Sequence, residues 1–138
     1  MIRICVPLAI LLALVAPACS NTSATAPASA SVPRTTETFT GTVQTAGSDL
    51  HGFTVSQTGQ VDVTLTAAGP PSTIVMGLEV GLPAGSTCAP FAGASTSAQA
   101  GATPQLSGTI SPGALCVEIH DIGNQAAPIS YAITVTHP

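Results

Sequence analysis

The chain has 138 residues and is acidic, with two basic residues against six carboxylates and a net charge of −4 at neutral pH. If an N-terminal leader containing Arg3 is removed, Arg34 is the one remaining cation. A protein with a single cation cannot neutralise a run of phosphates, so we expect no nucleic-acid partner. Only 6% of residues are charged and Trp is absent, and this Thr-, Ser-, Gly- and Ala-rich composition is common in secreted β-proteins.

Residues 1–18 have the order of a secretory signal peptide, with Arg3 near the start, an apolar run and then small residues. The apolar run is short for a bilayer span, and no stop-transfer segment follows it. The segment Ala16-Pro17-Ala18-Cys19 resembles a bacterial lipobox, with Ala16 where Leu is usual. We therefore predict an exported lipoprotein that is bound to the membrane, periplasmic or at the cell surface, through lipid on Cys19. The alternative is ordinary cleavage before Cys19, which would give a secreted protein with a free thiol.

Residues 19–35 form a Ser-, Thr-, Ala- and Pro-rich segment without hydrophobic periodicity. Such a segment buries too little apolar surface to offset its chain entropy. It is therefore predicted to be a linker that connects the lipid anchor on Cys19 to a folded domain at 36–138.

The domain shows short segments in which apolar and polar residues alternate, separated by Gly, Pro, Asn and Asp. This pattern predicts seven or eight strands and an all-β fold, an antiparallel β-sandwich. The segment 82–102 is expected to be mostly loop around a short strand near 88–91. The other predicted strands are 37–43, 50–55, 60–66, 73–80, 105–110, 113–120 and 130–136.

The segment 113–120 shows the two faces of a strand most clearly. Leu115, Val117 and Ile119 share one parity and are predicted to face the core, whereas Cys116, Glu118 and His120 share the other. We expect this second face to be solvated, as the outer face of a sandwich commonly is.

Cys88 and Cys116 are the thiols that remain after export and lipidation of Cys19, so they are predicted to form a disulfide. Because Cys116 points away from the core, this bond would hold the loop across the outer face or edge of the sheet. A metal–thiolate site is the alternative, but the two cysteines lack the local Cys-x-x-Cys spacing.

Chemistry at the surface is suggested mainly by Glu118 and His120 on one strand face, followed by Asp121. These residues are candidates for a metal site or an acid–base pair, but a third ligand is not identified, so no metal site is predicted. Asp49 and His51 also share a parity, and His51 is expected to be partly buried and structural. The sequence contains no catalytic elbow, zincin motif or phosphate-binding loop, so no catalytic residue and no cofactor are predicted.

Several segments combine spaced glycines with strand residues: 39–42, 47–55, 59–65, 111–119 and 130–135. Together they resemble the bacterial pre-peptidase C-terminal domain, whose last strands follow the patterns Pro-Gly-x-Tyr-x-Val-x-Val and Tyr-x-Leu-x-Val. The chain departs from the family at His51, Leu115 and Cys116, where aromatic residues are usual. The resemblance implies a jelly-roll-like β-sandwich of the kind attached to secreted enzymes as a binding or processing module. Some relatives bind calcium or collagen, but no ligand residue can be transferred to this chain.

These features favour a non-catalytic, exported module that interacts with an envelope protein or a glycan. An accessory module of a secreted peptidase system is an alternative. A small metal-dependent hydrolase that uses Glu118 and His120 is a further alternative.

Overall fold

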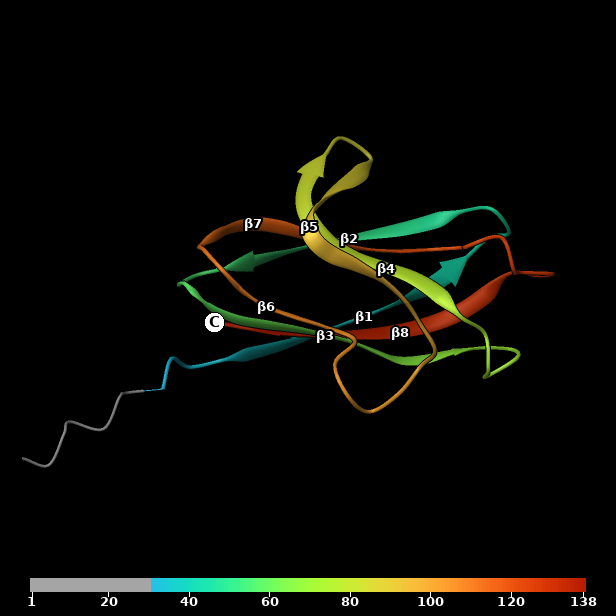
Figure 1. Cartoon of the computed structure of the whole chain (residues 1–138), viewed down its shortest axis with the longest axis horizontal. Coiled ribbons are helices and arrows are strands. Elements are labelled where there is room, and N and C mark those ends of the chain that lie inside the picture. The colour runs from blue at the N-terminus through green and yellow to red at the C-terminus, as the bar shows by residue number, and fades with distance from the viewer. Residues whose placement is uncertain (1–30) are drawn as a thin grey trace, which may run out of the picture. The chain divides into compact units, whose positions relative to one another are not determined.

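The computed structural model describes residues 31–138, which form an all-β sandwich of two four-stranded antiparallel sheets (Figure 1). The predicted signal peptide, Cys19 and most of the predicted linker lie outside the described residues. Within 31–138, no helix is long and apolar enough to cross a membrane. The strands are β1 (Thr35–Val43), β2 (Ser48–Val55), β3 (Gly59–Gly69), β4 (Met76–Ala84), β5 (Thr87–Ala98), β6 (Leu106–Ile110), β7 (Gly113–His120) and β8 (Ile129–His137).

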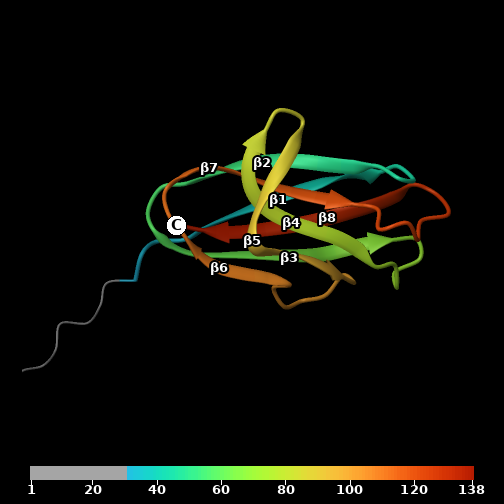
Figure 2. The same cartoon turned by 45° about the horizontal axis from the view of Figure 1, so that its top comes forward.

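The two sheets have the strand order of a jelly roll. One sheet runs β1-β8-β3-β6 and the other runs β2-β7-β4-β5, so each connection except the β4–β5 hairpin crosses from one sheet to the other. The two layers are visible in Figures 1 and 2. The predicted fold class, an antiparallel jelly-roll-like sandwich, is confirmed.

The core lies between the sheets and is built from the alternating positions of the strands. On β3, Val61, Val63 and Leu65 are almost fully buried, as their parity predicts. Tyr131 is the one aromatic residue of β8 and is buried in the same layer. The remaining buried residues are mostly aliphatic, so the core depends on β-branched and Leu side chains, as the aromatic-poor composition predicts.

The segment 82–102 differs from the prediction, because most of it is strand and not loop. Strand β5 has 12 residues and pairs with β4 from Met76↔Ala98 to Ala84↔Thr87, with one register shift between Glu79 and Gly81. Its Ala, Ser and Gly residues have low β-propensity, but pairing with a neighbouring strand overrides that preference.

The β4–β5 hairpin leaves the plane of its sheet at this register shift and rises from the sandwich in Figure 1. Gly81 permits the bend, because a Cβ at this position would lie 1.9 Å from the carbonyl oxygen of Ala89. The hairpin carries Cys88, which forms a disulfide with Cys116 of β7, with the two Cα atoms 5.8 Å apart. The predicted disulfide is thus confirmed.

The expectation of a solvated outer face on β7 is wrong. Leu115, Val117 and Ile119 face the core as predicted, but Cys116 and Glu118 on the opposite face are also buried, 1% and 7% exposed. The backbone N–H of Cys88 donates a 2.9 Å hydrogen bond to Oε2 of Glu118, so the hairpin reaches this face. Strand periodicity shows on which side a residue lies, but not whether a distant segment covers that side.

Candidate functional site

A cleft of about 470 Å³ lies between the two sheets, where strand β5 of one sheet approaches strand β6 of the other. Its volume is within the range of ligand-binding pockets. Each of these two strands pairs with one neighbour only, β5 with β4 and β6 with β3, so the cleft is flanked by two sheet edges.

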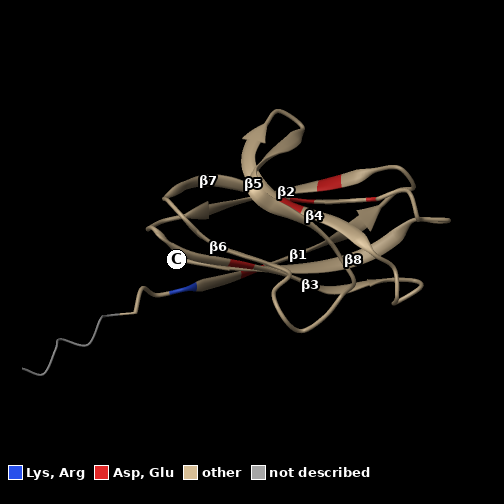
Figure 3. Ribbon diagram, in the orientation of Figure 1, with Lys and Arg blue, Asp and Glu red and all other residues tan. Residues whose placement is uncertain are grey.

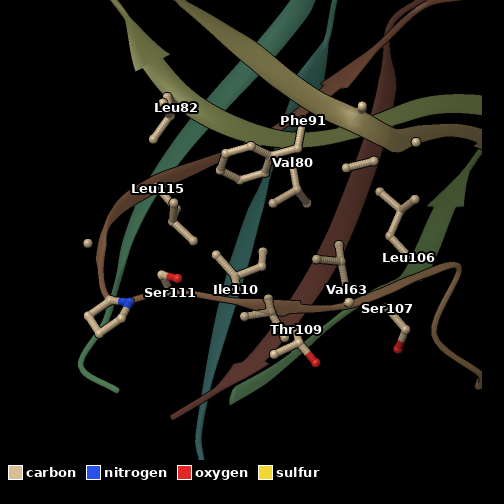
Figure 4. Close-up of a pocket in the computed structure, with 17 residues that line it drawn as sticks. Val63, Val80, Leu82, Phe91, Leu106, Ser107, Thr109, Ile110, Ser111 and Leu115 are labelled. Carbon is tan, nitrogen blue, oxygen red and sulfur yellow. The ribbon is translucent and has the colours of Figure 1, made fainter. Parts of the chain in front are cut away.

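The walls of the cleft are mostly apolar. In Figure 4 the ring of Phe91 lies between Leu115 and Val80, and Ile110 points toward them from β6. Leu82 stands on the β4 side of the cleft and is 52% exposed, the most exposed large hydrophobic residue among those described. Among residues 31–138, no Asp, Glu, Lys, Arg or His lines the cleft. It therefore suits an uncharged, apolar ligand group.

A polar cluster lies on the opposite, outer face of the β2-β7-β4-β5 sheet. Glu79 of β4 pairs directly with Glu118 of β7, and His120 is two positions further along β7. A side-chain nitrogen of His120 and one oxygen of each glutamate all lie within 4.8 Å of one another. Glu118 and His120 are the candidates that the sequence indicates, and the structure adds Glu79, which is 39 positions from Glu118 in the sequence.

The ring of His120 lies over Gly77, its register partner on β4. A Cβ at Gly77 would be only 2.1 Å from Nε2 of His120, so the glycine leaves the space that the ring occupies. Ser95 of β5 lies on the other side of the cluster and donates a 3.4 Å hydrogen bond to Oε2 of Glu79.

Asp121 is not part of this cluster. One of its carboxylate oxygens accepts a hydrogen bond from the backbone N–H of Ala46 at 2.8 Å, and the other accepts bonds from Gly123, Asn124 and Gln125. The bond from Ala46, followed by the other three, lowers the pKa of Asp121 despite partial desolvation. Its role is to hold the β7–β8 loop against the β1–β2 turn.

Asp49 and His51, the second pair that the sequence places on one face, meet at Tyr131. The Tyr131 hydroxyl donates a 2.5 Å hydrogen bond to Oδ2 of Asp49 and lies 2.6 Å from Nε2 of His51. The His51 ring is half-buried, as expected, and stacks on Phe39 with 4.7 Å between ring centroids. Burial, together with the Asp49 carboxylate, raises the pKa of Tyr131 above its ordinary value, so the hydroxyl keeps its proton. The arrangement fits a structural hydrogen-bond network that joins β2 to β8.

Arg34 is the one Lys or Arg in residues 31–138, and it contacts strands β3 and β8 of the other sheet. Its guanidinium lies 2.6 Å from Asp62 of β3 and also donates to the backbone carbonyls of Gln60 and Thr136. In Figure 3 the blue segment of Arg34 lies just before β1, whereas the red segments of β4 and β7 belong to the other sheet. Glu79 and Glu118 therefore have no Lys or Arg partner among the described residues.

The sequence predicts neither the apolar cleft nor the position of Glu79 beside Glu118. Leu82 lies in the segment predicted to be mostly loop, and Phe91 lies at the end of the short strand predicted near 88–91, although two large apolar side chains in an otherwise small-residue segment were a usable signal. Glu79 could not be linked to Glu118 without the β4–β7 register, which is a non-local property.

Cys19, the predicted lipidation site, lies outside the described residues. Comparison of the chain with family models, with curated proteins and with solved structures gives no match.

Proposed function

We propose that the chain is a non-catalytic, exported interaction module whose apolar cleft between β5 and β6 binds an extended, uncharged peptide segment of an envelope protein. The observation that carries the proposal is the cleft of about 470 Å³, which is flanked by two sheet edges and has no charged side chain from the described part of the chain in its lining. A free edge offers main-chain N–H and C=O groups, and a neighbouring apolar pocket can accept alternate side chains of an added strand.

The cleft favours a peptide over the glycan alternative. Phe91 is the only aromatic residue that lines it, and sugar rings are usually bound by stacking on aromatic faces. The hydroxyls of Ser107 and Thr109 point away from Phe91 and Val80 in Figure 4. An apolar side chain therefore fits the inner wall better than a polyhydroxylated ring.

The disulfide supports export, because such bonds persist in oxidising compartments. Together with the signal-peptide pattern at 1–18 and the lipobox-like segment before Cys19, it favours a lipoprotein anchored through residues 19–35. The resemblance to the pre-peptidase C-terminal domain adds one candidate class of partner, a separately encoded secreted peptidase.

Selection from a displayed library of random peptides on the purified chain tests the cleft. We expect enrichment of uncharged peptides with apolar residues at alternate positions, and at least tenfold weaker binding to Phe91→Ser. Leu82→Ser is the second variant, because its exposed side chain can be changed with little risk to folding. Ile122→Ser is the matched control, since Ile122 is 43% exposed and does not line the cleft. Equal binding to all four proteins, or no enrichment, would contradict the proposal.

A further inference from the structure

We propose that Glu79, Glu118 and His120 form a binding site for one zinc-class divalent cation on the outer face of the β2-β7-β4-β5 sheet. This proposal is independent of the peptide-binding cleft, which lies on the opposite side of the same sheet. It assigns a ligand to the one cluster of metal-ligating side chains found among residues 31–138.

The first argument is electrostatic. Glu79 and Glu118 face each other directly across the β4–β7 pair, and like-charged residues at such positions destabilise a sheet. Glu118 is 7% exposed, and glutamate is rarely buried to this degree unless it is paired or binds a metal. The one Arg of the described chain is bound to Asp62 in the other sheet. A bound divalent cation would supply the positive charge that this part of the chain does not provide.

The second argument is the direction of the Glu118 carboxylate. Its Oε2 accepts the hydrogen bond from the backbone N–H of Cys88, and this is the only hydrogen bond that it receives from the described residues. The carboxylate is therefore fixed in place by the disulfide-linked hairpin, with its other oxygen free to bind an ion. Fixing a ligand through a hydrogen bond from outside the site is common in metal centres.

The third argument is the distance between the ligand atoms. The three atoms lie within 4.8 Å of one another, each from a separate side chain. Ligands of a tetrahedral zinc ion at about 2.0–2.1 Å from the metal are about 3.4 Å apart, so small side-chain rotations close the site. Gly77 leaves room for the His120 ring. Ser95 of β5 donates a hydrogen bond to Glu79 from the side of β4 that faces away from β7. A water molecule would complete the fourth position.

The chemistry of the ligands selects the cation. One imidazole nitrogen with two carboxylates suits zinc and neighbouring transition metals, whereas calcium is bound by six to eight oxygen ligands. A bound ion would join β4 to β7, whereas the disulfide joins Cys88 of β5 to the same strand β7.

Isothermal titration of Zn²⁺ into the full chain tests the site. Cys5 and Cys19 are replaced by Ser in every sample, so that their thiols cannot bind the metal. We expect one zinc ion per chain, a higher unfolding temperature with zinc, and no displacement by excess Ca²⁺. Glu118→Gln and Glu79→Gln should each weaken binding at least tenfold, and Glu79→Gln decides the matter if Glu118→Gln does not fold.

Glu37→Gln is the matched control. Glu37 also lies beside a histidine, with Oε1 at 2.9 Å from Nε2 of His137, but no second carboxylate belongs to that pair. This variant should bind zinc as the parent does. Absence of saturable binding, or equal binding by the parent and both cluster variants, would overturn the proposal.

Discussion

The backbone N–H of Cys88 donates a 2.9 Å hydrogen bond to the buried carboxylate of Glu118, two positions after the cysteine to which Cys88 is covalently bonded. The disulfide and the polar cluster are thus parts of one arrangement. The bond to Cys116 holds the hairpin against β7, and the hairpin in turn covers Glu118. Loss of the disulfide should therefore affect both the stability of the fold and the accessibility of the carboxylate.

The double variant Cys88→Ser/Cys116→Ser should lower the free energy of unfolding by about 3–4 kcal/mol, the value expected for closing a loop of this length. The sequence separation of the two cysteines is 28 residues. Urea unfolding followed by circular dichroism measures the change. Reduction of the parent should lower its midpoint to that of the variant and leave the variant unchanged. If reduction does not shift the parent's midpoint, the disulfide does not stabilise the domain.

Intact-mass measurement of the protein purified from membranes tests the predicted anchor. We expect a chain that begins at Cys19 and carries covalently bound lipid, and we expect Cys19→Ser to move the protein to the soluble fraction. Cys88→Ser is the control for loss of a cysteine elsewhere, and it should stay with the membrane. An unmodified N-terminal Cys19 would show ordinary secretion instead.

Asp62 should make the domain sensitive to acid. Burial opposes its ionisation, but hydrogen bonds from Ser107, Arg34 and Gln60 outweigh that effect and lower its pKa from the ordinary value of 3.8. Because the folded-state pKa is the lower one, the stabilisation is complete above 3.8 and is lost as the pH falls through the folded-state value.

The Asp62→Asn variant should accordingly unfold at lower urea concentration than the parent at neutral pH, and the gap should narrow as the pH is lowered. Urea midpoints of both proteins across this range provide the measurement. A gap that stays constant in acid would mean that the charge of Asp62 is not what stabilises this part of the sheet.

Gly41→Ala should destabilise the domain by about 1–3 kcal/mol, the usual cost of overpacking. A Cβ at Gly41 would lie 2.4 Å from Oδ2 of Asp49 and 2.6 Å from the hydroxyl of Tyr131, so their hydrogen bond would have to move. Gly108→Ala is the matched control, because a Cβ there meets nothing within 4 Å. Thermal unfolding of the two variants should separate them, and equal melting temperatures would contradict the structural role of this network.

Many strands of the sandwich can be predicted from the alternation of apolar and polar residues, because this alternation is a property of each segment by itself. Strand β7 runs from Gly113 to His120 as predicted, because a Pro-Gly turn and an alternating run fix its start and its faces. Strand β5 could not be predicted in this way, since its Ala, Ser and Gly residues become a strand only through pairing with β4. The local residue pattern thus predicts β7, whereas β5 follows only from its pairing with a neighbouring strand.

The two candidate sites depend almost entirely on contacts between strands that are distant in the sequence. The cleft exists because Phe91 of β5 and Ile110 of β6 belong to different sheets whose edges approach each other. The polar cluster exists because the β4–β7 register sets Glu79 opposite Glu118. Parity predicts that Glu118 and His120 share one face of β7, but neither the burial of Glu118 nor the position of Glu79 beside it follows from the order of residues along one strand.

The Gly77→Ala variant tests the geometry of the polar cluster alone, because it changes none of the three proposed zinc ligands. A Cβ at Gly77 would lie 2.1 Å from Nε2 of His120, so the ring must leave the position from which its nitrogen reaches Glu79 and Glu118. Zinc affinity should then fall at least tenfold by isothermal titration, while circular dichroism shows the same strand content. Gly52→Ala on β2 is the control, since its Cβ would make only an ordinary 3.8 Å contact with the carbonyl of Leu115. Unchanged zinc affinity in Gly77→Ala would mean that the ring position over this glycine does not matter, and that His120 is not a ligand in the proposed geometry.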